Sequence, residues 1–248
     1  MRMIRDNTHR FAERPFYESA EIDAECERIV IGFLQSRGGV RWPVSTDDLL
    51  RLLEQNVSDL DLYADLSELG SNVEGVTDFS PPNPPRVRIS KDLASSQRQE
   101  NRLRTTITHE LGHVKFHDFL FQLAADNRDL FQVSRGTAKV KTAADPSQQC
   151  RRETIIDSSE RDWMEWQAGY ACGAFLMPRS VVTQVVVGFR REHDLLSDIE
   201  ASTEIGVRLI SRVTEQFGVS ADAARVRLLK LNVLTASLHT SIFDGYPK

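Results

Sequence analysis

The stretch that decides the fold reads His109-Glu110-Leu111-Gly112-His113. Its two histidines stand four residues apart, so on an α-helix their rings lie about 40° apart around the axis and can reach one metal ion. Glu110 projects to the same side of the helix, about 100° from the first ring. A carboxylate next to a metal-bound water can act as a general base. The spacing therefore predicts a catalytic metal helix.

The residues around this motif favour a helix with two distinct faces. An apolar stripe recurs at helical spacing and consists of Leu103, Ile107, Leu111 and Val114. An adjacent stripe carries Thr106, His109, Glu110, His113 and His117. We expect the first stripe in the core and the second facing a cleft; the alternative is a helix with surface histidines. Gly112 costs a helix on the order of 1 kcal/mol relative to Ala, which predicts close packing at that position.

A tetrahedral zinc site with two histidines needs a third protein ligand and leaves one position for water. A second helix, predicted over residues 162–178, offers Glu165. Small side chains near this residue would let two helix backbones come close, and Pro178 ends the helix; they are Ala168, Gly169, Cys172 and Gly173. On the residues alone, the alternative is a packed core helix with an exposed acid.

These two segments resemble the ImmA/IrrE family of metallopeptidases. The motif at 109–113 followed by His117 is similar to the metal helix of that family, and Glu165-x-x-Ala168-Gly169 leading into Leu176-Met177-Pro178 resembles its second helix. Arg102–Thr108 and Phe217–Ser220 are also similar, so that the resemblance covers roughly residues 25–235. Two positions depart from the family pattern: Gly169 replaces the usual Asn, and Ala171 replaces an aromatic residue.

The resemblance implies that His109, His113 and Glu165 bind one Zn²⁺ and that Glu110 is the catalytic base of a zinc-dependent endopeptidase. It further implies a specific protein substrate, often a helix-turn-helix repressor, and a role in stress response. The ligand set favours zinc, while Mn²⁺ or Fe²⁺ could take its place. The competing hypothesis is a non-enzymatic regulator that contains a metal and binds DNA or a partner protein.

The group that stabilises the oxyanion is open between three candidates. These are His117, Tyr170 and Arg104. Tyr170 lies about 140° around the predicted helix from Glu165, which counts against it. His117 is one turn beyond His113 and is either a second donor behind the metal ligands or a surface histidine.

The predicted fold is α+β: a mostly helical, zincin-like metallopeptidase domain with a small sheet of about three strands and a C-terminal helical region. Helices are expected over 18–36 and after Ser45, and strands at 60–63, 73–79 and 86–90. A proline-rich loop joins the last two strands. We expect residues 74–90 to bind an extended peptide as an added strand.

Residues 1–178 are predicted to form the metallopeptidase core, including a flap-like insertion at 126–160. The Gly, Ser, Thr and Ala content of this insertion favours a loop or short hairpin over a helix. Either it selects the substrate as a flap over the cleft, or it is a solvated insertion without that role. Cys150 within it could be a further metal ligand or have no part in the site.

Residues 179–248 are predicted to form the C-terminal helical region. A helix around 205–213 ends at Gly218, and Ser220 begins a second helix, a pattern that resembles a helix-turn-helix. Basic residues expected on its exposed face are Arg225, Arg227 and Lys230. Packing or substrate docking is favoured over DNA contact for this region.

The composition is that of an ordinary globular protein: 248 residues, 40% hydrophobic and 27% charged, with a net charge of −5. The negative charge argues against nucleic-acid binding driven by overall charge. The three cysteines, Cys26, Cys150 and Cys172, form no disulfide framework, which favours a reducing cytosol. Residues 1–11 lack a signal-peptide pattern, and no apolar run reaches the ~18 residues that span a bilayer. We expect a cytoplasmic protein without a membrane partner.

Overall fold

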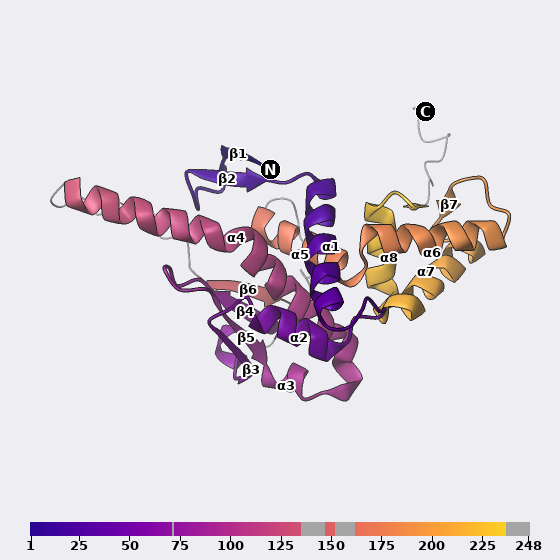
Figure 1. Cartoon of the computed structure of the whole chain (residues 1–248), viewed down its shortest axis with the longest axis horizontal. Coiled ribbons are helices and arrows are strands. Elements are labelled where there is room, and N and C mark those ends of the chain that lie inside the picture. Colours follow the sequence, from indigo (N-terminus) through magenta and orange to yellow (C-terminus); the bar gives the residue numbers. More distant parts are fainter. Residues whose placement is uncertain (71, 135–146, 152–161, 237–248) are drawn as a thin grey trace, which may run out of the picture. The chain divides into compact units, whose positions relative to one another are not determined.

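The structure is a computed structural model that describes residues 1–70, 72–134, 147–151 and 162–236 (Figure 1). The chain divides into two compact units, Met1–Pro178 and Arg179–Lys248. The described residues form an α+β fold in which helices predominate, which confirms the predicted fold class.

The first unit combines helices with a four-stranded sheet and a two-stranded sheet. Its elements in chain order are β1 (Arg2–Arg5), β2 (Glu13–Phe16), α1 (Ser19–Ser36), α2 (Thr46–Glu54), β3 (Asp59–Ala64), the 3₁₀ turn η1 (Ser67–Leu69), β4 (Val73–Asp78), β5 (Arg86–Ser90), α3 (Lys91–Ala94), the 3₁₀ turn η2 (Gln97–Gln99), α4 (Glu100–Ser134), β6 (Ser147–Arg151) and α5 (Trp163–Leu176). Figure 1 shows the long helix α4 running beside the four-stranded sheet. The predicted helices and strands of this unit are therefore present.

The main sheet has the strand order β3-β5-β4-β6, with β3 parallel to β5 and the other pairs antiparallel. Val87 and Ile89 of β5 are buried, while Arg86 is exposed, as the alternation in the sequence predicts. The prediction of about three strands is wrong because β6 adds a fourth at the edge of β4. Its sequence, Ser-Gln-Gln-Cys-Arg, has neither the alternation nor the β-branched residues that identify a strand.

The prediction of a loop or hairpin across residues 126–160 is wrong for two parts of that range. Residues 126–134 continue α4, and this stretch contains no Gly or Pro that would end a helix. Residues 147–151 form β6. The rest of the predicted flap, 135–146 and 152–160, lies outside the described residues.

The predicted starts of the first two long helices are confirmed. Glu18 caps α1 through a capping box with Glu21. Ser45 caps α2, and its side chain accepts a hydrogen bond from the Asp48 backbone N–H. The buried face of α1 carries the apolar side chains of Ile22, Cys26, Val30, Phe33 and Leu34.

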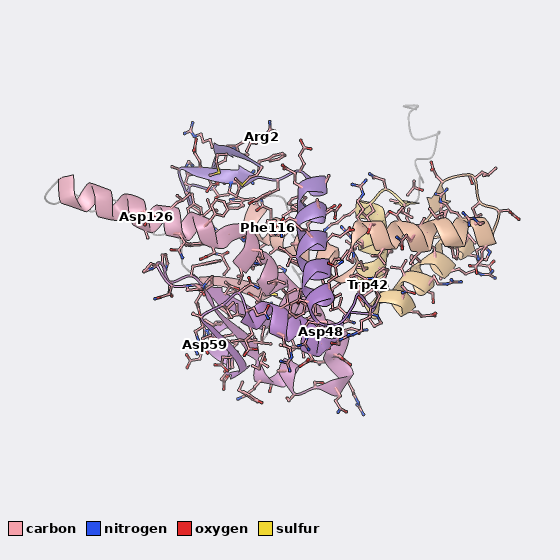
Figure 2. The ribbon with its side chains drawn as sticks, in the orientation of Figure 1. Arg2, Trp42, Asp48, Asp59, Phe116 and Asp126 are labelled. Carbon is pink, nitrogen blue, oxygen red and sulfur yellow. The ribbon has the colours of Figure 1, made fainter. Side chains whose placement is uncertain are left out.

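Asp48 of α2, labelled in Figure 2, is fully buried and pairs with two arginines. Arg37 Nε lies 3.0 Å from Oδ1, and Arg41 Nη2 lies 2.7 Å from Oδ2. Burial alone would raise the pKa of Asp48, but the hydrogen bonds from Ser45 and Arg37 and the charge of Arg41 outweigh it. The pKa of this carboxyl is therefore lowered in the folded chain.

Asp48→Asn should lower the free energy of unfolding by about 2 kcal/mol at neutral pH, because it removes a buried acceptor of charged hydrogen bonds. A lowered folded pKa stabilises the fold above the unfolded value of about 4, and this contribution is lost as the pH falls through the folded pKa. Urea unfolding should thus show a difference between variant and wild type that shrinks in acid. The control Asp47→Asn changes a carboxylate that is 64% exposed. Equal urea midpoints for Asp48→Asn and wild type at neutral pH would contradict the prediction.

The second unit contains α6 (Arg179–Glu192), β7 (Ile199–Glu200), α7 (Glu204–Phe217), α8 (Ala221–Lys230) and β8 (Leu234–Thr235). Gly218 ends α7 in the left-handed region with a φ of 58°, and Ser220 caps α8, which confirms the predicted turn. The predicted exposure is correct for Arg225 and wrong for Arg227, which is buried. Arg227 lies on the buried face of α8 because it follows Ala224, which is also buried, by about one helical turn.

No single helix in the described ranges is long and apolar enough to cross a membrane. Helices α5 and α6 pass this test of length and composition only when they are taken together. Burial inside the first unit accounts for the apolar character of α5, since 11 of its 14 residues are buried.

Candidate metal centre

The candidate metal centre lies where α4 and α5 pack closely together. A Cβ atom at Gly112 of α4 would lie 3.0 Å from Ala168 Cα and 3.1 Å from its carbonyl oxygen. Both positions hold small residues, so the two backbones approach without a clash. This contact explains the glycine inside α4 and brings Glu165, in the first turn of α5, over the histidines of α4.

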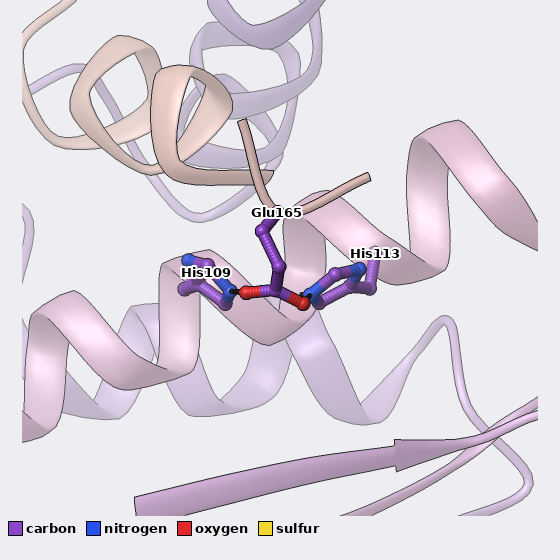
Figure 3. Close-up of side chains that lie close together, drawn as sticks. All are labelled: His109, His113 and Glu165. Carbon is purple, nitrogen blue, oxygen red and sulfur yellow. Dashed lines mark hydrogen bonds and ion pairs between the residues drawn. The ribbon is translucent and has the colours of Figure 1, made fainter. Parts of the chain in front are cut away.

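His109, His113 and Glu165 converge on one point (Figure 3). Glu165 Oε2 lies 3.2 Å from His109 Nε2, and Glu165 Oε1 lies 3.1 Å from His113 Nε2. The two Nε2 atoms are 3.1 Å apart. A tetrahedral ion with bonds of about 2.0–2.1 Å would hold its donors about 3.3 Å apart. These three buried side chains could therefore hold one metal ion with little adjustment.

The three buried side chains shift one another's pKa values. Burial alone would raise the pKa of Glu165, but the adjacent His113 and His109 rings outweigh it and hold the pKa well below its usual range. Burial also opposes the charged form of His113, yet the carboxylate of Glu165 raises the pKa of that ring. An ionised carboxylate is thus kept in a buried position, where a divalent ion would balance its charge.

Behind His113, three side chains form a chain of hydrogen bonds. His113 Nδ1 lies 3.0 Å from His117 Nδ1, and His117 Nε2 lies 3.0 Å from Gln167 Oε1. Gln167 Nε2 then donates to the Pro15 carbonyl oxygen at 3.1 Å. If His113 held a metal ion through Nε2, its ring proton would be on Nδ1. His113 Nδ1 would then donate to His117 Nδ1, and His117 Nε2 would donate to Gln167 Oε1. His117 would thus accept one hydrogen bond through Nδ1 and donate one through Nε2.

This direction requires a neutral His117. Burial and the neighbouring His113 hold the pKa of His117 well below its ordinary value, so the ring carries no charge. Of the three candidates for a supporting role, His117 is therefore the one that contacts a ligand, and it does so through the far nitrogen of His113. It is a positioning residue and lies on the side of His113 opposite the cluster.

His117→Ala should weaken metal binding by about 10–100-fold, because it removes the group that fixes the tautomer and orientation of His113. Competition with a chromophoric zinc chelator measures the affinity directly. His193→Ala in the second unit is the matched control, because it removes a histidine whose ring packs against Phe189 of the same unit. Unchanged affinity in His117→Ala would show that the hydrogen-bond chain does not support the ligand.

Glu110 lies beside the cluster, fully buried against β4. The Thr77 hydroxyl of β4 donates to Oε2, while Oε1 faces Gly75. A side chain at Gly75 would collide with this oxygen. Burial raises the pKa of Glu110, against the opposing effect of the two histidines. A carboxylate with a raised pKa is a better proton acceptor, which suits a general base.

The two other candidates for the oxyanion group, Arg104 and Tyr170, point away from the cluster. The Tyr170 hydroxyl donates to Asp23 of α1 at 3.0 Å, and Arg104 Nη2 donates to the Val44 carbonyl oxygen at 2.9 Å. Both assignments are therefore wrong. The physical reason is the same for each: five residues along a helix rotate a side chain by about 140° away from the ligand.

The expected open cleft is absent from the described structure. His109, Glu110, His113 and His117 are all fully buried. Strand β4 is paired with β5 on one edge and with β6 on the other, so residues 73–78 offer no free edge to a peptide in this arrangement. The prediction that 74–90 binds substrate therefore requires β6 to leave its place.

Sequence analysis missed three residues of the centre. Gly75 carried a signal, because an isolated glycine inside a strand indicates a close approach of other atoms. Thr77 and Gln167 carried none, since their contacts depend on how β4 and α5 lie against α4.

No protein-family model matches the chain, and no curated protein matches its sequence. The likeness to the ImmA/IrrE family therefore stays a prediction that rests on the residues of the two metal-bearing helices.

Proposed function

We propose that the first unit is a zinc-dependent endopeptidase with a zincin-like fold. The observation that carries the proposal is the Glu110 carboxylate next to three convergent ligands, His109, His113 and Glu165. Three protein ligands leave the fourth tetrahedral position to water or substrate, which is characteristic of catalytic rather than structural zinc sites. Bound zinc would supply Lewis acidity and an activated water.

The residues of the chain then have separate tasks. His109, His113 and Glu165 hold the ion, and His117 orients His113. Glu110 Oε1 accepts a proton from the attacking water and passes it to the amine that leaves when the peptide bond breaks. Thr77 fixes the other carboxylate oxygen, and Gly75 leaves the space in which Oε1 can face the reacting groups.

Two imidazoles and one carboxylate at tetrahedral spacing favour zinc, with Mn²⁺ or Fe²⁺ as alternatives. The substrate would be an extended segment of a specific protein, paired with β4 through backbone hydrogen bonds. The resemblance to the ImmA/IrrE family favours a helix-turn-helix repressor as this protein and stress response as its setting. A cytoplasmic location and the absence of a membrane partner are parts of the same proposal.

The test is digestion of a peptide mixture derived from a whole proteome, followed by mass spectrometry of the new termini. The zinc-loaded chain should cut at defined sites, lose this activity to a chelator and regain it when zinc is restored. A fully zinc-loaded protein that leaves the whole mixture intact would contradict the proposed activity.

The second candidate is a non-enzymatic regulator in which the metal is structural. The complete burial of Glu110 favours it, because a buried carboxylate does not meet a substrate. Against it stands the three-ligand set, since structural zinc sites use four protein ligands. A gel-shift assay with random DNA at physiological salt tests the DNA-binding form of this alternative.

A further inference from the structure

Strand β6 lies at the edge of the sheet where an extended substrate would pair. It runs antiparallel to β4, with Gly75 opposite Cys150 and Thr77 opposite Gln148. Recognition by strand addition needs an unpaired sheet edge. In the described residues that edge of β4 is filled by the chain itself, at the two β4 residues that contact Glu110.

The register directs the Cys150 side chain toward the catalytic carboxylate. Residues directly opposite each other in an antiparallel pair point to the same face of the sheet. Gly75 faces Glu110 Oε1, so its partner Cys150 faces the same way. The thiol is fully buried, and burial together with the charges of Glu110 and Glu165 raises its pKa well above the usual range. A neutral thiol therefore covers the general base.

The composition of β6 makes it the more replaceable partner of β4. Of its residues whose side chains are described, Cys150 is the only apolar one, and Gln148 is buried against the Arg10 side chain at 3.4 Å. By contrast, β5, the other partner of β4, contributes the buried apolar side chains of Val87 and Ile89. A polar strand contributes mainly backbone hydrogen bonds, and an incoming peptide would restore those bonds.

We propose that β6 is an internal occupant of the substrate-binding edge and keeps the catalytic centre closed. While Ser147–Arg151 pair with β4, Cys150 covers Glu110; an extended peptide reaches the centre only by taking the place of β6. The inference rests on the proposed function, which makes the edge of β4 the place where a peptide substrate pairs. It accounts for a catalytic carboxylate that no substrate could touch in the closed arrangement.

A disulfide between β4 and β6 tests this inference by fixing the closed state. Asp78 and Ser147 are opposite each other, and alternation along β4 places Asp78 on the face away from Glu110. Opposed residues of an antiparallel pair are close enough for a disulfide. The variant Asp78→Cys, Ser147→Cys should, when oxidised, release bound zinc to a chelator at least about tenfold more slowly than when reduced. Its peptide cleavage should slow to a similar extent and recover with reductant.

The two single cysteine variants are the matched controls, since each has one of the two substitutions without the cross-link. Asp78→Cys also reproduces the loss of the Asp78–Arg88 ion pair. Peptide mapping confirms that residues 78 and 147 are joined and that the three native thiols are not. The single variants should respond equally to oxidant and reductant in both assays.

The opposite change replaces Ser147–Arg151 by Gly-Ser-Gly-Ser-Gly, which keeps the chain length and removes the strand-forming side chains. This variant should release zinc and cleave peptides at least about tenfold faster than wild type. Circular dichroism checks that it folds; if it does not, the cross-linked variant still decides the question.

Oxidised and reduced forms of the cross-linked variant that cleave peptides and release zinc equally fast would overturn the inference while leaving the peptidase function intact. Slower zinc release on oxidation, without cleavage by any form of the protein, would support closure by β6 and contradict the peptidase function instead. The two hypotheses therefore fail in different assays.

Discussion

Glu110→Gln should retain one bound zinc per chain and lose peptide cleavage by about 10³-fold. Glutamine has the same shape as glutamate, and its amide oxygen can still accept the hydrogen bond from Thr77. The amide cannot accept a proton, so the water would have to attack the peptide carbonyl without a general base. Elemental analysis measures the zinc content, and the rate of appearance of new termini from a cleaved peptide measures activity.

A matched control for this variant is Glu68→Gln, which changes an exposed carboxylate on η1 of the same unit. The control should keep both zinc and activity. Cleavage at the wild-type rate by Glu110→Gln would remove Glu110 from the mechanism, whereas loss of zinc from that variant would show that the residue also supports the metal ion.

Glu165→Ala should weaken zinc binding by more than about 100-fold, which exceeds the effect expected for a residue behind the ligands such as His117. The substitution removes one of three ligands and the only ligand that carries a charge. The consequence for stability follows from linkage: wild type gains roughly 4 kcal/mol at a free zinc concentration about 1,000 times the dissociation constant, and the variant loses most of this gain.

Thermal unfolding with and without zinc measures that difference, and a competing chelator gives the affinity. Glu165→Gln is an informative companion because it keeps the side-chain volume and an oxygen donor and removes only the charge. It should fall between Glu165→Ala and wild type. Zinc stabilisation of wild type and Glu165→Ala by the same amount would exclude Glu165 from the ligand set.

Local patterns predicted most of the helices and the inner strands of the fold. The apolar stripe that includes Ile107 and Leu111 has a clear helical period, and Ser45 and Ser220 are strong N-caps, so α2, α4 and α8 begin or extend near where the sequence indicates. Strand β6 could not be predicted in this way. It is a strand because β4 pairs with it from far away in the chain, and its own side chains favour no particular structure.

The residues of the candidate site likewise fall into those that a local pattern predicts and those that depend on long-range contacts. His109, Glu110 and His113 are placed by one helix, so their spacing was sufficient to group them. The spacing of the second helix left Glu165 open between a ligand and an exposed acid, and it was the resemblance to a family that favoured a ligand. The contact from His117 through Gln167 to Pro15 joins three distant parts of the chain, and no local pattern encodes it. The covering of the centre by β6 also depends on a contact between distant parts of the chain, the pairing of β6 with β4.

The most direct test of the account is zinc X-ray absorption of the zinc-loaded wild-type protein. We expect one zinc per chain with four nitrogen or oxygen donors at about 2.0–2.1 Å, two of them imidazoles, and no sulfur donor at about 2.3 Å. The imidazole signal should fall when His109 or His113 is replaced. A protein that binds no zinc, or a spectrum that requires a cysteine sulfur on the ion, would contradict the proposed centre.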